Sequence, residues 1–153
     1  MTTYVDSSAL VPVYVPERFS AVAREVLRGL PQVPYTPLHG LEVPNAFALL
    51  MGRRIISADE HRAIRTQLQE DIEAQRLVPV ALDWERIFAT ACELSESHTA
   101  KLLTRSLDLI HVAAAHCTNC RVFVSADDRQ ITTARAAGLK VIDIKRSARP
   151  SRR

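Results

Sequence analysis

What this sequence lacks narrows the classes of protein it can represent. It has only three cysteines, Cys92, Cys117 and Cys120, too few for the disulfide framework of a small secreted domain. Cys117 and Cys120 have the spacing of a metal or redox pair, but a zinc site needs four ligands and no second Cys/His pair lies nearby. The pair also closes a predicted helix, whereas a thioredoxin-type pair opens one. We therefore interpret all three as structural thiols.

Long apolar runs are also missing. No stretch approaches the length of a membrane-spanning helix, and the first residues, Met1–Asp6, lack the basic segment that opens a secretion signal. We expect a cytoplasmic protein that does not associate with a membrane.

The remaining composition is typical of one ordinary domain. The chain has 153 residues, of which 47% are hydrophobic and 24% charged, enough to bury one substantial core. Residues 145–153 hold five basic side chains and no acid, so the net charge of +3 becomes −2 without them. We predict one domain over residues 1–144, followed by a flexible basic tail over 145–153. Such a tail serves either to contact phosphates or to keep the protein soluble.

Short strands alternate with helices along the chain. Strands are predicted at 3–5, 33–36, 77–82, 121–124 and 140–144, and helices at 9–14, 20–30, 38–51, 58–75, 84–98, from 106, and at 128–137. No hairpin signal joins any two strands. The pattern therefore predicts an α/β fold with a parallel sheet flanked by helices.

Several details of these helices can be predicted. Ser57 and Glu60 form the capping-box pattern at the start of the fourth helix. Ser106 is expected to cap its helix, with Leu107, Ile110 and Ala114 as the buried stripe. In the helix at 38–51, Pro44 is tolerated best near the start, which places Glu42 in the first turn. The apolar side of that helix is expected to hold Leu41, Ala46, Leu49 and Leu50.

Four acidic residues stand at the ends of these elements. Asp6 and Asp127 follow predicted strands, and Glu42 and Asp108 lie near the starts of helices. Each alone is explained locally, as a helix cap, a turn residue or a partner of the helix dipole. Together they would share the carboxyl edge of a parallel sheet, where ligands bind. Clustered carboxylates repel one another unless a cation compensates them, and oxygen ligands of this kind suit Mg²⁺.

The ordered set of motifs resembles the PIN-domain nucleases, in particular the VapC-type toxins of toxin–antitoxin pairs. The resemblance runs from Tyr4 to Ile144. It is carried by Tyr4-Val-Asp6-Ser-Ser-Ala-Leu10, Leu41-Glu42-Val-Pro-Asn45-Ala46, Ser106-Leu-Asp108-Leu-Ile-His111-Val-Ala-Ala-Ala115, Val124-Ser-Ala-Asp127-Asp-Arg129 and Ala137-Gly-Leu-Lys-Val-Ile142. Two features depart from the family pattern: Pro44 within the Glu42 helix, and Asp128 directly beside Asp127.

The resemblance implies a single PIN-like domain with a parallel sheet between helical layers, acting as a hydrolase of RNA phosphodiester bonds. It implies a Mg²⁺- or Mn²⁺-dependent endoribonuclease and toxin, with a cognate antitoxin as partner and a homodimer as the assembly. The catalytic and metal-binding residues would be Asp6, Glu42, Asp108 and Asp127, with Asp6 and Asp108 as the direct ligands. The residues assigned to substrate binding would be Ser7, Asn45, Ser125 and Arg129.

Two other functions remain open at this point. A catalytically silent PIN-like module could keep the fold and only bind RNA. A phosphoacceptor receiver domain also gathers acids at strand ends, but it needs an acidic pair after the first strand, and this chain has Asp6-Ser7 there. His111, one helical turn after Asp108, is either a buried hydrogen-bonded residue or a substrate contact, and we favour the former.

Overall fold

The computed structural model describes residues 1–147, and the alternation of strands and helices predicted from the sequence is confirmed there. The strands are β1 (Thr3–Val5), β2 (Val33–Tyr35), β3 (Leu77–Pro79), β4 (Val122–Ser125) and β5 (Lys140–Asp143). The helices are α1 (Ser7–Tyr14), α2 (Ser20–Arg28), α3 (Pro37–Gly52), α4 (Ala58–Glu73), α5 (Trp84–Leu94), α6 (Ala100–Leu102), α7 (Ser106–Cys117), α8 (Asp128–Ala136) and α9 (Ile144–Ser147). A π-helical segment, η1 (Ser95–Thr99), joins α5 to α6.

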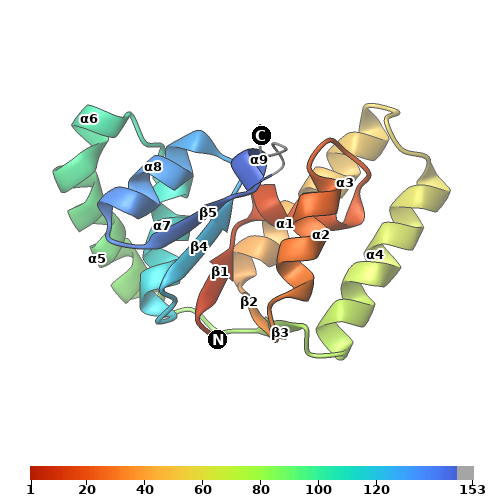
Figure 1. The fold of residues 1–153 in the computed structure, drawn as a ribbon, viewed down its shortest axis with the longest axis horizontal. Coiled ribbons are helices and arrows are strands. Elements are labelled where there is room, and N and C mark those ends of the chain that lie inside the picture. Colours follow the sequence, from red (N-terminus) through yellow and green to blue (C-terminus); the bar gives the residue numbers. More distant parts are fainter. Residues whose placement is uncertain (148–153) are drawn as a thin grey trace, which may run out of the picture.

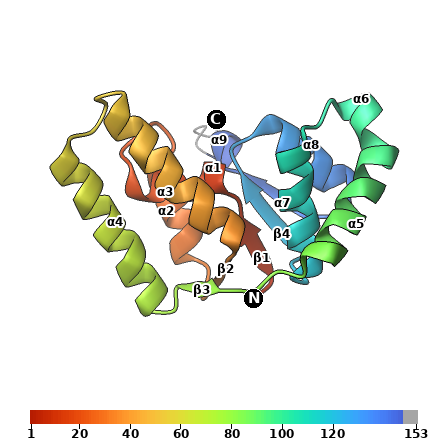
Figure 2. The same cartoon turned by 180° about the vertical axis from the view of Figure 1, so that it is seen from behind.

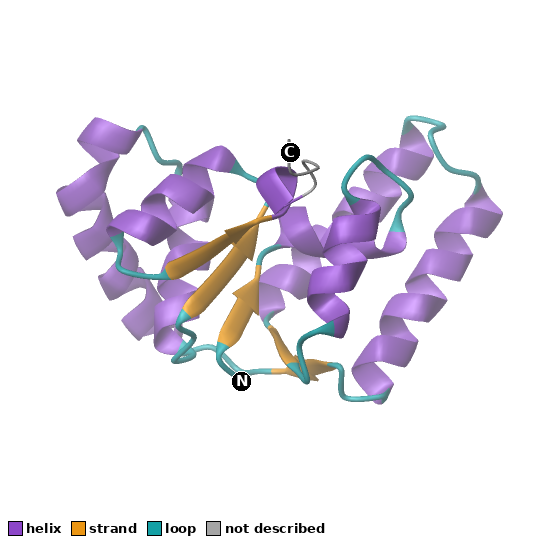
Figure 3. Cartoon of the chain, in the orientation of Figure 1, coloured by secondary structure: helices purple, strands orange, loops and turns teal. Residues whose placement is uncertain are grey.

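All strand pairs are parallel, as expected for an α/β fold. One sheet has the order β1-β4-β5, and β2 pairs with β3 in a second sheet. Val5 lies opposite Val124, and Ser125 lies opposite Asp143. The carboxyl ends of these three strands therefore meet at one edge, which the arrowheads of Figure 3 mark.

The two sheets adjoin where β1 packs beside β2. At this junction the carbonyl of Val5 accepts a hydrogen bond from Nε2 of His39, at 2.9 Å. A side chain thus satisfies a carbonyl that a neighbouring strand would otherwise serve. The hydrogen bonding between strands is therefore interrupted between β1 and β2 at Val5, one residue before Asp6.

The helices form layers on both sides of the strands. Helices α3, α5 and α7 lie on one face, with α2 and α8 on the other, and α4 flanks the β2–β3 end (Figures 1 and 2). None of the helices in the described part of the chain combines the length and apolar character needed to cross a membrane.

Strand β1 separates the core into two clusters. Successive side chains of a strand point to opposite faces, so Tyr4 packs with residues of α5 and α7 and Val5 with residues of α1 and α3. Both side chains are almost fully buried, as is typical of a central parallel strand. Asp6 follows directly and is held at the junction of the two halves.

The start of α7 differs from the prediction. Ser106 is the first helical residue and Arg105 occupies the cap position. Leu107 is 58% exposed, so its assignment to the buried stripe is wrong. The buried face instead carries Asp108, Leu109, His111 and Val112, because burial of Asp108 and His111 turns Leu107 outward.

The α3 helix also begins earlier than predicted. Proline is favoured at the first helical position, and Pro37 takes that place, which puts Glu42 in the second turn rather than the first. The face that packs inward holds Val43 and Phe47, while Leu41 and Leu49 are 70% and 48% exposed. The predicted apolar side is therefore wrong for those two leucines.

The predicted basic tail begins in an ordered element. Ile144 is fully buried and opens α9. Lys145 forms an ion pair of 2.7 Å with Asp128, and Arg146 one of 3.5 Å with Asp143. Lys145, Arg146 and Ser147 therefore make up the rest of α9, and the other residues of the predicted tail, 148–153, lie outside the described residues.

Candidate active site

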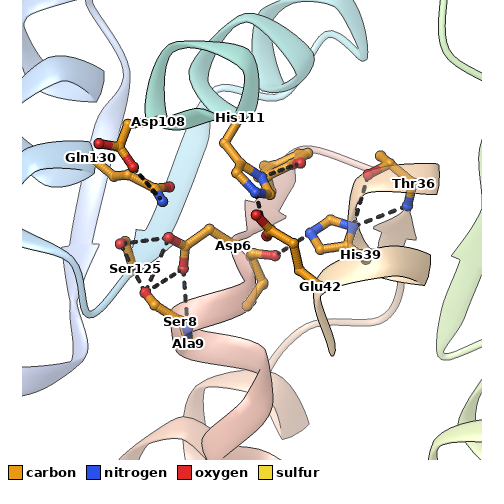
Figure 4. A network of polar contacts seen from close by, with 12 residues as sticks. Asp6, Ser8, Ala9, Thr36, His39, Glu42, Asp108, His111, Ser125 and Gln130 are labelled. Carbon is orange, nitrogen blue, oxygen red and sulfur yellow. Dashed lines mark hydrogen bonds and ion pairs between the residues drawn. The ribbon is translucent and has the colours of Figure 1, made fainter. Parts of the chain in front are cut away.

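Asp6 is the most deeply buried acid of the site. It directly follows β1 and caps α1, and it is 0% exposed. Oδ1 accepts hydrogen bonds from the hydroxyl of Ser8 at 2.8 Å and the backbone N–H of Ala9 at 3.0 Å, and Oδ2 accepts from the hydroxyl of Ser125 at 2.8 Å. Figure 4 shows this carboxylate between α1 and β4.

Burial raises the pKa of Asp6 to about 6, although His111 and the hydrogen bonds from Ser8 and Ser125 act in the opposite direction. Removal from water disfavours the charged form more than these neighbours favour it. At neutral pH the site therefore contains a carboxylate that a cation would stabilise.

Glu42 belongs to a chain of hydrogen bonds that enters the core. Oε2 lies 2.7 Å from Nε2 of His111, and Nδ1 of His111 lies 2.9 Å from the hydroxyl of Tyr4. A carboxylate only accepts hydrogen bonds, so Nε2 of His111 is the donor and Nδ1 faces the tyrosine. Burial alone would raise the pKa of Glu42, but the hydrogen bond and charge of His111 hold it below the ordinary value.

His111 is only 1% exposed. Of the two roles considered for it, the buried hydrogen-bonded residue is confirmed. Its hydrogen bond to Glu42 holds that carboxylate in place (Figure 4).

His39 links α3 to the end of β1 through two hydrogen bonds. Its Nδ1 accepts from the backbone N–H of Thr36 at 3.0 Å, which leaves Nε2 to donate to the carbonyl of Val5. Burial, with His111 nearby, lowers the pKa of His39 to about 3. The ring is therefore neutral at physiological pH and ties the start of α3, and with it Glu42, to the strand that carries Asp6.

Asp108 comes from α7 and faces α8. It is 8% exposed, and Oδ1 lies 3.3 Å from Nε2 of Gln130. Its Oδ2 accepts from the backbone N–H of Arg105 at 3.3 Å. Oε1 of Gln130 is buried and has no hydrogen-bond partner among the described residues, so one polar atom beside Asp108 lacks a donor.

Asp127 plays a different part from the other three acids. It caps α8, with Oδ1 accepting from the backbone N–H groups of Arg129 at 2.8 Å and Gln130 at 3.3 Å. Its own N–H donates to the hydroxyl of Ser125, which also bonds Asp6. The fold therefore brings Asp6, Glu42 and Asp108 around one space (Figure 4), and Asp127 adjoins it through Ser125.

A groove opens beside the site, and Glu42 is the one of the four acids that lines it. It has a volume of about 410 Å³ and lies between α1, α3 and α8. Of the residues predicted to bind substrate, Ser7 and Asn45 line this groove together with Glu42 and Gln130. Ser7 helps to lower the pKa of Glu42 but makes no hydrogen bond of ordinary geometry.

The other two predicted substrate residues are placed differently. Ser125 is fully buried, and its hydroxyl contacts Asp6 and Ser8 rather than the open groove. Arg129 is exposed in the first turn of α8. Direct contact of either residue with substrate stays a prediction.

Comparison with known proteins identifies the family. The family model described as PIN domain matches residues 3–136, which include all four acids. The chain belongs to the PIN domain family.

A solved structure supports the same fold. The crystal structure of FitAcB from Neisseria gonorrhoeae is similar with a TM-score of 0.63 and 15% sequence identity, covering 94% of this chain and 99% of that chain. No match was found among curated proteins. Membership of the PIN family also removes the receiver-domain alternative.

Four residues of this PIN domain site were not identified from the sequence: Tyr4, Ser8, His39 and Gln130. Ser8 lies two residues after Asp6 and Gln130 three after Asp127, which are spacings for side-chain contacts at helix starts. Such spacings also occur at ordinary caps, so they give no functional signal alone. Tyr4 and His39 lie far along the chain from His111 and Val5, and only the fold brings them together.

Proposed function

We propose that this PIN domain is a Mg²⁺- or Mn²⁺-dependent endoribonuclease and the toxin of a toxin–antitoxin pair. The observation that carries the proposal is the buried, hydrogen-bonded carboxylate of Asp6, facing the space that Glu42 and Asp108 also border. A purely structural cap would gain nothing from a second and third carboxylate in the same space, because like charges destabilise one another.

The donor chemistry fits a hard divalent cation. Within residues 1–147, no group of three or more His, Cys, Asp or Glu side chains is arranged as a cage that could hold a metal ion. Mg²⁺ does not require such a cage, since it binds through one or two carboxylates and keeps several waters. The buried Oε1 of Gln130 without a donor is an acceptor that a water of a hydrated ion would satisfy.

We assign the ion to the carboxylates of Asp6 and Asp108, with Glu42 and Asp127 beside it. A bound Mg²⁺ supplies neutralisation of phosphate charge and activation of water toward phosphorus.

The chain's own residues hold the parts in place. Ser8 and Ser125 fix the orientation of Asp6, and His111 fixes Glu42. Ser7 and Asn45, on the groove wall, are positioned to contact the sugar–phosphate backbone of RNA.

Cleavage of RNA by the purified protein tests this function. We expect a fluorophore–quencher RNA to be cut in Mg²⁺ or Mn²⁺ and to stay intact in EDTA. Asp108→Asn should lose at least about 100-fold in rate, as expected when a group that stabilises transition-state charge is removed. The matched control is Asp59→Asn, an exposed acid on α4. Binding without cleavage in either metal would instead support the silent RNA-binding module.

We assign the antitoxin partner to the groove. Its wall combines Glu42 with apolar side chains of Val11, Ala46 and Leu49, and Leu49 is 48% exposed. An arginine of the partner would pair with the carboxylates in two-pronged geometry while apolar residues cover Leu49. Co-expression with a candidate antitoxin should yield a complex that Leu49→Asp weakens, whereas Leu103→Asp, on the distant α6–α7 connection, should not.

We also propose a homodimer. Trp84 and Phe88 lie side by side on the surface of α5, with their ring centres 6.2 Å apart and 40% and 54% exposure. Aromatic side chains are enriched in protein interfaces. Sedimentation velocity should show a dimer for the wild type and a monomer for Phe88→Asp. A monomeric wild type at micromolar concentration would contradict this assembly.

A further inference from the structure

A second recess lies at the same sheet edge as the carboxylates. It has a volume of about 300 Å³ and is lined by Arg18, Phe19, Asp128, Asp143, Lys145 and Arg146. Ser125 lies opposite Asp143 in the parallel sheet, and Asp128 directly follows Asp127. The recess is therefore one strand away from the residues that hold Asp6.

The charge of this recess is positive. Lys145 is paired with Asp128 at 2.7 Å, and Arg146 with Asp143 at 3.5 Å. The hydrogen bond and charge of Lys145 keep the pKa of Asp128 below its ordinary value. Arg18 is the third cation, and within residues 1–147 its guanidinium has no carboxylate partner, lying 5.4 Å from the ring centre of Phe19.

The recess adjoins the groove of the candidate active site. Glu17 lines the groove and Arg18 lines the recess, so consecutive residues of the α1–α2 connection face the two spaces. On the opposite side, Gln130 lines the groove and Asp128 lines the recess, so the first turn of α8 also borders both. Figure 1 shows α9, which carries Lys145 and Arg146, above the carboxyl ends of the strands.

We propose that this recess is a phosphate subsite for the single RNA strand whose cleaved bond lies in the groove, with Arg18 as its principal ligand. The proposal rests on the nuclease function above. Arginine presents a planar fork that matches phosphate oxygens, and the partly exposed ring of Phe19 offers a stacking surface for a base. A positive recess beside an aromatic ring is the combination that binds single-stranded nucleic acid.

Asp128 competes with the RNA for the cations of the subsite. Its carboxylate occupies Lys145 in the absence of a ligand, so an incoming phosphate must displace it. Removing this charge should therefore strengthen RNA binding, whereas removing Arg18 should weaken it. A general change in net charge would also act in opposite directions, because Arg18→Gln lowers the net charge by one and Asp128→Asn raises it by one. Each variant is therefore compared with one of equal charge change at an exposed position away from the recess, Arg121→Gln for Arg18 and Asp59→Asn for Asp128.

The test is fluorescence anisotropy with a short fluorescein-labelled single-stranded RNA in EDTA, over a series of salt concentrations. Arg18→Gln should weaken binding about fivefold and reduce the slope of log affinity against log salt by about 0.7, the value for one lost phosphate contact to a single strand. Asp128→Asn should tighten binding several-fold. Arg121→Gln, an exposed arginine at the opposite, amino end of β4, is the matched control and should behave as the wild type.

Two results would overturn the subsite. One is an Arg18→Gln protein whose affinity and salt slope equal those of the Arg121→Gln control. The other is a loss of affinity for an acidic peptide, with none for RNA, which would make the recess a protein-binding site. Cleavage by the wild type in Mg²⁺ is measured on the same samples. A wild type that cleaves RNA while Arg18→Gln matches its control rejects the subsite alone, and a wild type that does not cleave rejects the nuclease function.

Discussion

The acids of this site accept local backbone hydrogen bonds and also border the candidate site. Asp6 and Asp127 are the caps of α1 and α8, and Asp108 accepts from the backbone N–H of Arg105. The local explanations available from the sequence are therefore correct for three of the four residues. What distinguishes them from ordinary caps is their convergence, which depends on strand order and cannot be deduced from any one residue.

The raised pKa of Asp6 predicts a pH-dependent stability in the absence of metal. Its pKa rises from 3.8 to about 6 on folding, chiefly through burial. The folded state therefore binds more protons than the unfolded state between these values, and stability falls as pH increases through this window. The loss is on the order of 3 kcal/mol by pH 7.

Asp6→Asn should remove this dependence and abolish RNA cleavage. The test is urea denaturation with EDTA at pH 4 to 7. The unfolding free energy of the variant minus that of the wild type should increase as pH rises. The variant should be the more stable protein at pH 7. A difference that is constant over this range would show that Asp6 is not the group that titrates.

His111 is predicted to act by positioning Glu42. His111→Leu would leave the hydroxyl of Tyr4 and the carboxylate of Glu42 without their buried partner, at a cost of about 1 to 3 kcal/mol for each unsatisfied group. The catalytic constant for RNA cleavage should fall while KM changes little. His111→Gln, which keeps a donor toward Glu42, should recover part of the rate, and equal loss in both variants would contradict a positioning role.

At the scale of elements, the predictions succeeded where local chemistry determines the structure. The capping box of Ser57 and Glu60 is present, with hydrogen bonds of 3.1 and 2.7 Å, and every predicted strand exists. The errors came from tertiary context. Leu41 and Leu107 are apolar but exposed, because the inward positions of their helices are taken by residues that pack on the strands or serve the site.

The Ser57 cap gives a prediction confined to one element. Ser57→Ala should lower the stability of the protein by about 1 kcal/mol, seen as a fall in Tm of about 2 to 4 °C. RNA cleavage at 25 °C should be unchanged, because none of the four acids lies on α4, which flanks the β2–β3 end of the molecule (Figure 1). Thr66→Ala, at an exposed position within α4, is the control and should show no such fall.

At the scale of the whole molecule, the site joins two halves of the protein. Asp6 lies between β1 and α1, Glu42 comes from α3, and Asp108 comes from α7 on the other side of β1. A cation held by Asp6 and Asp108 would bind only the folded state, since the two residues are about a hundred positions apart in the chain.

Mg²⁺ should therefore stabilise the protein. At a concentration about 100 times Kd the gain is about 2.7 kcal/mol, measurable as a rise in Tm in a thermal scan at pH 7.5. Asp108→Asn should abolish the rise, and Asp59→Asn should retain it. An equal rise in both variants would place the ion elsewhere.

The two core clusters divided by β1 are also nearly divided in sequence. Apart from Tyr4 and Leu38, the cluster around α5 and α7 consists of residues after position 81, and most of the other cluster lies before it. Ala81 is exposed in the connection between β3 and α5, so the chain could be cut there into 1–81 and 82–153. Each fragment would carry part of the catalytic set, and β1 would have to pair again with β4 to complete it. The domain is thus suited to fragment complementation. Neither fragment alone should cleave RNA, and recovered cleavage would show that the two fragments have reassembled.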